Sequence, residues 1–340
     1  MLNRVYRLVA PHTVEPVEVQ VPIDEGLVVV RPTHLSICNA DQRYYQGRRP
    51  ARVMAKKLPM ALIHEGIGRV VFGGGQFESG QMVVMLPNAP ASKDDCIAEN
   101  YLTTSQFCGS GFDGFMQELC VLPPSRVLAL PAGIDLEVAA FTELVSVAVH
   151  AIARFDDIAH ARRETVGVWG DGNVGFIVSL VLKTLYPQMC VYVFGRNGYK
   201  LSDFTFADRT FLTSDIPDDL LVDHAFECCG GEGAVHAIDQ IIDHIKPEGT
   251  ISLLGVSENP VAINTRMVLE KGLRMYGSSR SGRVDFERTL ELYEANPQVV
   301  DYLQALVGSV VTVESVRDIA TAFDVDIRKQ MGKTIMKWNM

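Results

Sequence analysis

The feature that most constrains the fold is a glycine pattern near the middle of the 340-residue chain. A short apolar run ends at Gly170, and Gly172, Gly175 and an apolar stretch over 176–182 follow. The first glycine permits a tight turn, the second lets the backbone approach a pyrophosphate, and the third lets a helix pack on the strand. A second apolar run, 191–194, arrives after one helix length, as a βαβ unit requires. The pattern predicts a dinucleotide site with phosphates at a helix N-terminus.

Alternation of strand and helix continues beyond this motif. Residues 223–228 and 249–255 have the composition of strands, and 234–244 have that of a helix between them. This order predicts an α/β fold with a doubly wound parallel sheet, a Rossmann domain. We expect this domain to span residues 146–284.

The first 145 or so residues are rich in strands with Gly and Pro between them, and a helical pattern begins at about 144. Beyond Ser278 the pattern is helical, and the chain ends in a strand-like segment at 333–338. We therefore expect a β-rich catalytic domain made of residues 1–145 and 285–340.

Composition excludes several classes of protein. The net charge of −10 argues against nucleic acid or an anionic membrane as the main partner. The seven cysteines are odd in number and scattered, which is not a disulfide framework. No run reaches the roughly 18 apolar residues of a membrane span, and no apolar leader core follows Met1. We expect a cytoplasmic protein.

Three segments of the first domain carry groups that bind metals. They contain Cys38, then His64 with Glu65, and then Glu143. Taken singly, a cysteine is usually a small buried apolar residue, a histidine a hydrogen-bonded core residue, and Glu143 a charge at a helix N-terminus. Zinc, however, takes thiolate, imidazole and carboxylate ligands. Their order before a nucleotide motif favours a zinc site.

Taken together, these motifs make the chain resemble the zinc-dependent medium-chain dehydrogenase/reductase family. The resemblance covers nearly the whole chain and implies a GroES-like β-rich catalytic domain beside the Rossmann domain. It also implies Cys38, His64 and Glu143 as zinc ligands, with Glu65 either an exchangeable fourth ligand or a residue that contacts a ligand. The activity implied is hydride transfer between a nicotinamide and a carbonyl that zinc polarises.

Two positions depart from that family. Members often carry Ser or Thr two residues after the ligand cysteine as part of a proton relay, and here Ala40 stands there. The relay must then use another group or water. Many members also hold a structural zinc on four closely spaced cysteines, whereas here only Cys96 and Cys108 lie in that region. We therefore expect no structural zinc.

The end of the second Rossmann strand indicates which nicotinamide binds. NAD-specific folds usually place an acidic residue there to bind the ribose 2′-hydroxyl, and this chain has Gly195. Arg196 and Lys200 follow and can neutralise a 2′-phosphate, although both could be ordinary surface cations. We expect NADPH, bound by Gly170, Gly172, Asn173, Val174, Gly175, Arg196 and Lys200.

Basic residues are concentrated between two of the expected zinc ligands. Most are expected to be surface charges, but Arg43 lies five residues after Cys38 and could hold an anionic substrate. Tyr44 could offer a hydroxyl to a polyol, and Arg280 lies near the expected domain junction. The full basic set is Arg43, Arg48, Arg49, Arg52, Lys56, Lys57, Arg280 and Arg283.

A closer resemblance rests on the runs 36–45, 62–66, 169–173 and 277–282. These runs are similar to those of the bacterial ribulose-5-phosphate reductases, which share Ala40 and Arg43. The resemblance implies reduction of ribulose 5-phosphate to ribitol 5-phosphate, the precursor of CDP-ribitol for cell-wall polymers such as teichoic acid. It also implies a homodimer that could associate with a ribitol-5-phosphate cytidylyltransferase.

Two other functions remain open on the sequence. An NAD-linked polyol or alcohol dehydrogenase would act on an unphosphorylated substrate. Such an enzyme would not require Arg43 to bind a phosphate, and it would not require Gly195 in place of the usual acid. A nucleotide-binding regulator without turnover would bind a nicotinamide but no zinc, and the set of Cys38, His64 and Glu143 argues against it.

Overall fold

The structure is a computed structural model that describes residues 1–22 and 24–340. The chain forms two compact units, one of Met1–Ser146 with Ser281–Met340 and the other of Val147–Arg280. The sequence predicts domain crossings at 145/146 and 284/285. In the structure the return to the first unit comes at Ser281, because the residues that begin helix α9 (Arg283–Ala295) already belong to that unit.

The first unit is built mainly of strands. These are β1 (Leu2–Ala10), β2 (Thr13–Gln20), β3 (Val28–Ile37), β4 (Met60–Ala61), β5 (Glu65–Phe72), β6 (Met82–Met85), β7 (Asn88–Ala89), β8 (Gln106–Phe107), β9 (Cys120–Leu122), β10 (Val127–Ala129), β17 (Val307–Val313) and β18 (Lys333–Trp338). Its helices are α1 (Asn39–Tyr45), α2 (Ala51–Lys57), α3 (Leu136–Ala139), α9, α10 (Pro297–Leu303) and α11 (Val316–Arg328), and α4 (Thr142–Ile158) begins in it.

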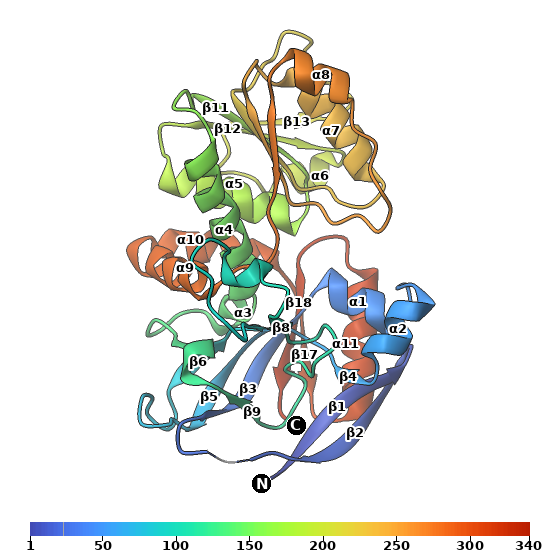
Figure 1. Ribbon diagram of the computed structural model, residues 1–340, viewed down its shortest axis with the longest axis vertical. Helices are drawn as coiled ribbons and strands as arrows, with labels where there is room; N and C mark the ends of the chain where they lie inside the picture. The colour runs from blue at the N-terminus through green and yellow to red at the C-terminus, as the bar shows by residue number, and fades with distance from the viewer. Residues whose placement is uncertain (23) are drawn as a thin grey trace. The chain divides into compact units, whose positions relative to one another are not determined.

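The main sheet of this unit joins the two ends of the chain. Its strand order is β10-β6-β5-β3-β18-β17, with β9 also paired to β3, and a smaller sheet has the order β2-β1-β4. Strands β18 and β3 are neighbours in this sheet (Figure 1), and they run antiparallel with Ile335 opposite Ser36. The segment that follows Ser278 is therefore not helical throughout, since β17 and β18 complete the sheet.

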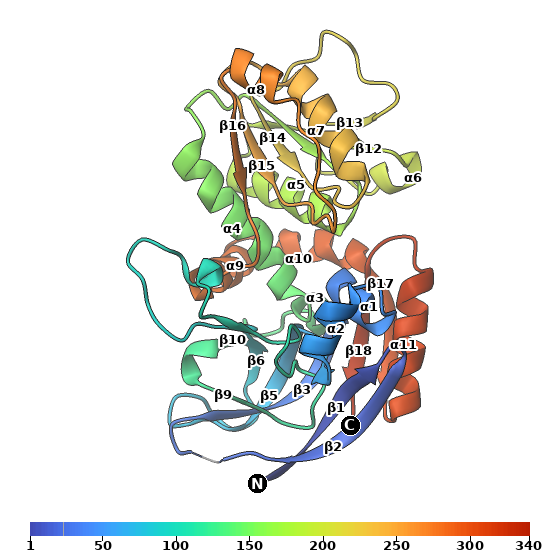
Figure 2. The same ribbon diagram turned by 45° about the vertical axis from the view of Figure 1, so that its right-hand side comes forward.

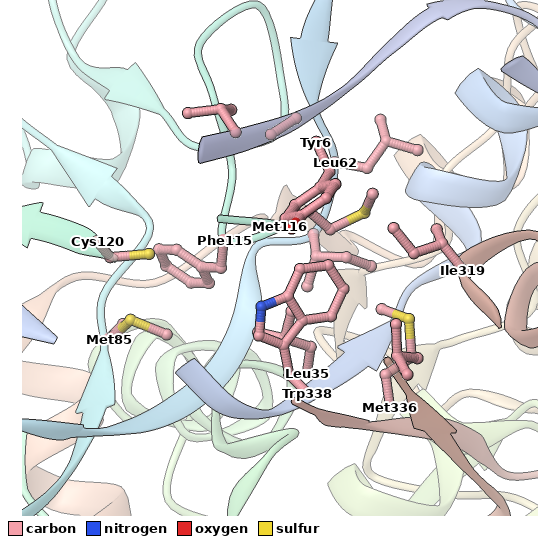
Figure 3. Packing of buried hydrophobic residues seen from close by; sticks show 14 of the residues in the cluster. Tyr6, Leu35, Leu62, Met85, Phe115, Met116, Cys120, Ile319, Met336 and Trp338 are labelled. Carbon is pink, nitrogen blue, oxygen red and sulfur yellow. The ribbon is translucent and has the colours of Figure 1, made fainter. Parts of the chain in front are cut away.

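Apolar side chains from both ends of the chain fill the core between these sheets (Figure 3). Trp338 of β18 meets Tyr6 of β1 edge to face, with ring centroids 5.5 Å apart. Met336, two residues earlier and on the same face, is fully buried in the same cluster as Phe115 and Ile319. Burial of side chains this large stabilises the fold by roughly 1.5–3 kcal/mol each. The last strand is therefore part of the core.

The second unit is a six-stranded sheet with the order β13-β12-β11-β14-β15-β16, and every pair in it is parallel. Helices α5 and α7 lie on either side of it (Figures 1 and 2). The predicted doubly wound parallel sheet is confirmed. Its elements are β11 (Thr165–Trp169), α5 (Asn173–Leu185), β12 (Cys190–Gly195), α6 (Gly198–Leu201), β13 (Arg209–Leu212), β14 (His224–Glu227), α7 (Gly233–His244), β15 (Thr250–Leu253), α8 (Thr265–Glu270) and β16 (Arg274–Gly277).

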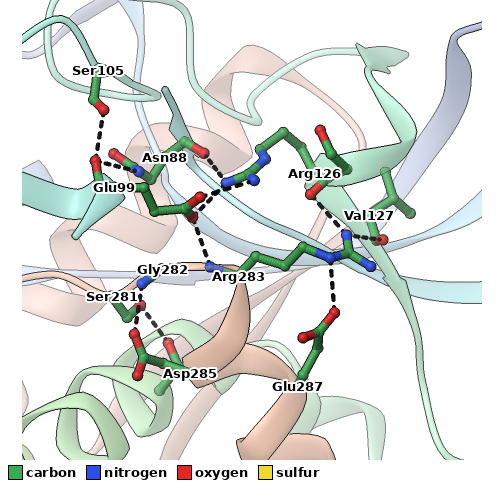
Figure 4. A network of polar contacts seen from close by, with 12 residues as sticks. Asn88, Glu99, Ser105, Arg126, Val127, Ser281, Gly282, Arg283, Asp285 and Glu287 are labelled. Carbon is green, nitrogen blue, oxygen red and sulfur yellow. Dashed lines mark hydrogen bonds and ion pairs between the residues drawn. The ribbon is translucent and has the colours of Figure 1, made fainter. Parts of the chain in front are cut away.

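A polar network anchors the loop segment 88–108 of the first unit (Figure 4). The Glu99 carboxylate accepts hydrogen bonds from both Arg126 Nη atoms, at 2.7 and 3.2 Å, and from the backbone N–H of Arg283, at 2.7 Å. The Glu99 carbonyl accepts bonds from the side chains of Asn88 and Ser105. Cys96, in the same segment, is exposed. This network ties the segment to the start of α9.

None of the helices in residues 1–22 and 24–340 combines the length and apolar character that crossing a bilayer requires.

Candidate metal centre and cofactor-binding edge

The pairing of β3 with β5 brings together three side chains of types that can bind a metal. Cys38 follows β3, His64 precedes β5, and Glu65 begins β5 opposite Ser36. One ligand atom from each of these side chains lies within 4.8 Å of the other two. Ile63, immediately before His64, has φ of 72°, a left-handed conformation that is strained for a β-branched residue. The backbone therefore turns at Ile63, directly before the histidine of this group.

Asp41, which the sequence analysis did not single out, holds this group in place. Its buried carboxylate accepts hydrogen bonds from the backbone N–H of Cys38 and of Ile63, both at 3.0 Å. Its Oδ1 lies 3.6 Å from Nδ1 of His64. Burial lowers the pKa of His64, but Asp41 and Cys38 outweigh it and the pKa lies well above its ordinary value. A carboxylate beside one ring nitrogen commonly orients a histidine that binds a metal through the other.

Glu65 is held by a second residue that the sequence analysis missed. Lys333 Nζ of β18 lies 2.8 Å from Glu65 Oε1, and the two side chains are 3% and 0% exposed. Burial lowers the pKa of Lys333, but the negative charges of Glu65 and Cys38 raise it above its ordinary value. The other oxygen, Glu65 Oε2, is buried and has no hydrogen-bond partner among the described residues. An unpartnered carboxylate oxygen beside a thiol and an imidazole fits a zinc ion.

Glu143, the remaining expected ligand, lies near this group without being one of its three members. It is 5% exposed near the start of α4. Burial raises its pKa to about 7, the His64 charge opposes that shift, and the Glu65 charge adds to it. These interactions place Glu143 within electrostatic reach of the group. Its role as a ligand stays a prediction.

The expected substrate residues lie on α1 and at the end of the second unit. Arg43 is in the last turn of α1, and Tyr44 is 3% exposed. The Cζ atom of Arg49 and the Nζ atom of Lys57 lie over the Tyr44 ring, 5.0 and 5.6 Å from its centroid. Arg280 has φ of 59°. Their contact with a substrate stays a prediction.

The glycine motif has the expected geometry at the carboxyl edge of the second unit's sheet. Gly170 follows β11 with φ of 139°, and Gly172 is the N-cap of α5, with open space where a side chain would be. A Cβ at Gly175 would lie 1.9 Å from the Gly170 carbonyl oxygen, so only glycine fits there. Asn173 and Val174 form the first turn of α5. The backbone is therefore open to a pyrophosphate at the start of this helix.

The loop after β12 carries the expected 2′-phosphate residues. Arg196 is exposed and follows the strand directly, and Lys200 is half-buried in α6. Both lie at the same sheet edge as the glycine motif, since β11 and β12 are parallel neighbours.

This combination of fold and donor group is that of a zinc-binding alcohol dehydrogenase. Residues 24–132 match the family model of the alcohol dehydrogenase GroES-like domain, and residues 201–295 match that of the zinc-binding dehydrogenases. The chain belongs to this family, the medium-chain dehydrogenase/reductases, so the resemblance seen in its sequence is confirmed.

Within the family, its close relatives share one activity. The chain is 53% identical to a ribulose-5-phosphate reductase of Bacillus spizizenii and 51% identical to ribulose-5-phosphate reductase 1 of Staphylococcus aureus, in both cases over 100% of each chain. The crystal structure of S. aureus TarJ in complex with NADPH superposes with a TM-score of 0.90 at 46% identity, covering 100% of both chains.

Proposed function

We propose that this protein is a ribulose-5-phosphate reductase that uses NADPH and zinc to make ribitol 5-phosphate for CDP-ribitol and cell-wall polymers. The observation that carries the proposal is the group of Cys38, His64 and Glu65, in a chain that matches such reductases from end to end. In the balanced reaction, the ketone takes a hydride and a proton, and the products are the alcohol and NADP⁺.

The chain's own residues have separate tasks in this reaction. Cys38, His64 and Glu65, with Glu143 nearby, would hold the zinc, and Asp41 fixes the histidine ring. Bound zinc would polarise the ketone as a Lewis acid while the nicotinamide supplies the hydride. Since Ala40 offers no hydroxyl, the proton comes from water or another group.

Recognition of the phosphate requires a local cation, because the chain as a whole carries −10. Arg43 supplies it in this proposal, since a planar guanidinium can donate two parallel hydrogen bonds to a phosphate. Binding energy from that end of the sugar also positions the ketone, so its loss lowers turnover as well as affinity.

The deciding experiment measures NADPH oxidation with ribulose 5-phosphate, ribulose and xylulose 5-phosphate in parallel. Arg43→Ala should lower kcat/KM for ribulose 5-phosphate roughly 10- to 100-fold while barely changing the rate with ribulose. Arg52→Ala, which removes an exposed arginine of α2, is the matched control. If the wild type reduces ribulose as well as its phosphate, the proposal fails and a polyol dehydrogenase replaces it.

We infer further that the enzyme is a cytoplasmic homodimer, and that it could associate with a ribitol-5-phosphate cytidylyltransferase that consumes its product. Support for a dimer comes from the two edge strands of the six-stranded sheet, β13 and β16, whose outer backbone groups can pair with a second chain. Light scattering of the purified protein tests the dimer, and a monomeric mass would refute it.

A further inference from the structure

The glycine motif contains one carboxylate, that of Asp171, and it accepts hydrogen bonds from the protein backbone. Asp171 lies between Gly170 and Gly172, after β11, and reaches the loop that follows β12. Its Oδ2 accepts two hydrogen bonds, from the backbone N–H of Arg196 at 2.8 Å and from that of Asn197 at 2.9 Å. Asn197 in turn accepts a bond from the Tyr199 N–H through its side chain at the start of α6. The loop that carries Arg196 is therefore fixed at successive points.

Gly195 is what lets Asp171 fit. A Cβ at Gly195 would lie 2.6 Å from the Asp171 Cβ and 2.9 Å from its Oδ2, so no larger residue could stand there without moving the carboxylate. This is the strand end where NAD-specific folds carry the acid that binds the ribose 2′-hydroxyl. Here that space holds a carboxylate whose Oδ2 is engaged by the protein backbone.

This arrangement decides which groups can meet a 2′-phosphate. The N–H groups of Arg196 and Asn197 are already bound by Asp171, so they do not serve as phosphate donors. Side-chain cations must do so, and Arg196 directly follows the strand.

We propose that Asp171 is the positioning residue for cofactor choice: by binding the Arg196–Asn197 backbone, it holds the Arg196 guanidinium where a 2′-phosphate binds. The inference rests on the NADPH preference of the proposed function. It assigns Asp171 a supporting role, because an unfixed loop would lose entropy on binding and the guanidinium would hold the phosphate less well.

The test uses the full chain and two ligands that differ only in the 2′-phosphate, 2′,5′-ADP and 5′-AMP. Calorimetry gives the ratio of their affinities in the wild type, Asp171→Ala and Asp171→Asn, without the need for zinc or a sugar. Asp171→Ala should lower the preference for 2′,5′-ADP about tenfold, since it removes two hydrogen bonds to a charged acceptor, and should change 5′-AMP binding little. Asp171→Asn keeps an acceptor oxygen and should retain most of the preference.

Three results would overturn the proposal. Tighter binding of 2′,5′-ADP by both variants would mean that Asp171 merely repels the phosphate. Equal losses for both ligands would mean that it supports the whole loop without regard to the phosphate, and an unchanged ratio would mean that it does not position Arg196. Asp218→Ala, which removes an exposed carboxylate of the same unit, is the control, and thermal unfolding checks that each variant is folded.

A failure of the proposed function gives a different result in this experiment from a failure of the role of Asp171. A wild type that binds the two ligands equally has no 2′-phosphate preference, so both proposals fall. A wild type that prefers 2′,5′-ADP and keeps that preference in Asp171→Ala refutes the role of Asp171 alone.

Discussion

At the scale of single residues, the buried pair of Lys333 and Glu65 is the most consequential contact of the metal centre. Both side chains are excluded from water, and Lys333 supplies the counter-charge to Glu65. Removing one member of such a pair leaves an uncompensated buried charge, which is more costly than the loss of an exposed pair. A zinc ion at the same group would supply a counter-charge of its own.

Lys333→Met therefore has an effect that depends on the metal. We expect the metal-free variant to lose about 3–5 kcal/mol of unfolding free energy and the zinc-loaded variant to lose less. Lys337→Met, on the same strand but in a partly exposed pair with Glu137, should cost less than about 1 kcal/mol in either state. Denaturant titrations with and without zinc measure this. Equal losses in both states would show that Glu65 does not respond to the metal.

A second prediction concerns His224, whose two ring nitrogens are both engaged. One contacts the Arg162 carbonyl at 3.0 Å, and the other accepts from the Thr250 N–H at 3.1 Å, which fixes the neutral form. Burial, and then the neighbouring His160, lowers its pKa from 6.5 to about 4. As the pH falls, this histidine is therefore protonated in the unfolded chain at a higher pH than in the folded chain. Its contribution to stability is fully present above pH 6.5 and is lost as the pH drops towards 4.

The loss over that window should be roughly 2–3 kcal/mol. His224→Gln should flatten the dependence of unfolding free energy on pH between 6.5 and 4, even though the variant is less stable throughout. His236→Gln, at an exposed position on α7, should leave the slope unchanged. Parallel curves for the wild type and His224→Gln would contradict the assignment.

The sequence predicts the donor residues better than it predicts their supports. Cys38, His64 and Glu143, with Glu65 as an exchangeable fourth ligand, stand out because thiolate, imidazole and carboxylate suit zinc, and the structure groups Cys38, His64 and Glu65. Asp41 is near in sequence, but an acid three residues after a cysteine has no signature until the bend at Ile63 is known. Lys333 lies 268 residues from Glu65, and only the pairing of β18 with β3 brings them together.

At the scale of elements, Glu99 anchors segment 88–108 to the rest of the first unit. It binds the buried Arg126, which directly precedes β10, and the first residue of α9, so one side chain joins the loop to two other parts of the first unit. The sequence predicts no four-cysteine zinc here, and it does not predict the hydrogen-bond network around Glu99. A hydrogen-bond network has no fixed residue spacing, in contrast to a set of metal-binding cysteines.

Glu99→Ala should cost about 2–4 kcal/mol, because the Arg126 guanidinium is left buried without its carboxylate. Amide hydrogen exchange should rise within residues 88–108 more than in the Rossmann sheet. Glu118→Ala, which breaks the more exposed pair with Arg4, is the control and should change little. Protection of residues 88–108 that is unchanged from the wild type in Glu99→Ala would refute the anchoring role.

The sequence predicts an element more accurately when the residue pattern of that element is more regular. The strands of the parallel sheet next to the glycine motif are short apolar runs at βαβ spacing, and they are found where expected. Strand β17 alternates half-buried and exposed residues between two helices, so its pattern is weak beside theirs. The partner of β17 is β18, and both strands lie in the part of the chain that returns to the first unit, so this pairing depends on the tertiary fold.

At the scale of the whole molecule, the residues expected to bind the metal and those expected to bind the cofactor belong to different compact units. Cys38, His64 and Glu65 lie in the first, while the glycine motif and Arg196 lie in the second. We expect one zinc per chain by metal analysis. Chelation or Cys38→Ser should abolish turnover and leave 2′,5′-ADP affinity nearly unchanged. Two zinc ions per chain, or full activity without zinc, would contradict this.

The pairing of β18 with β3 also bears on synthesis at the ribosome. The second unit is one continuous stretch, Val147–Arg280, so it is complete before the last 60 residues are made. The first unit has to wait, because its central sheet lacks β18 until the C-terminal residues emerge. At about 5–20 residues per second, the N-terminal segment stays incomplete for seconds. Lys333 then reaches Glu65 as one of the last contacts, so the nascent chain assembles its nucleotide-binding half before its metal centre.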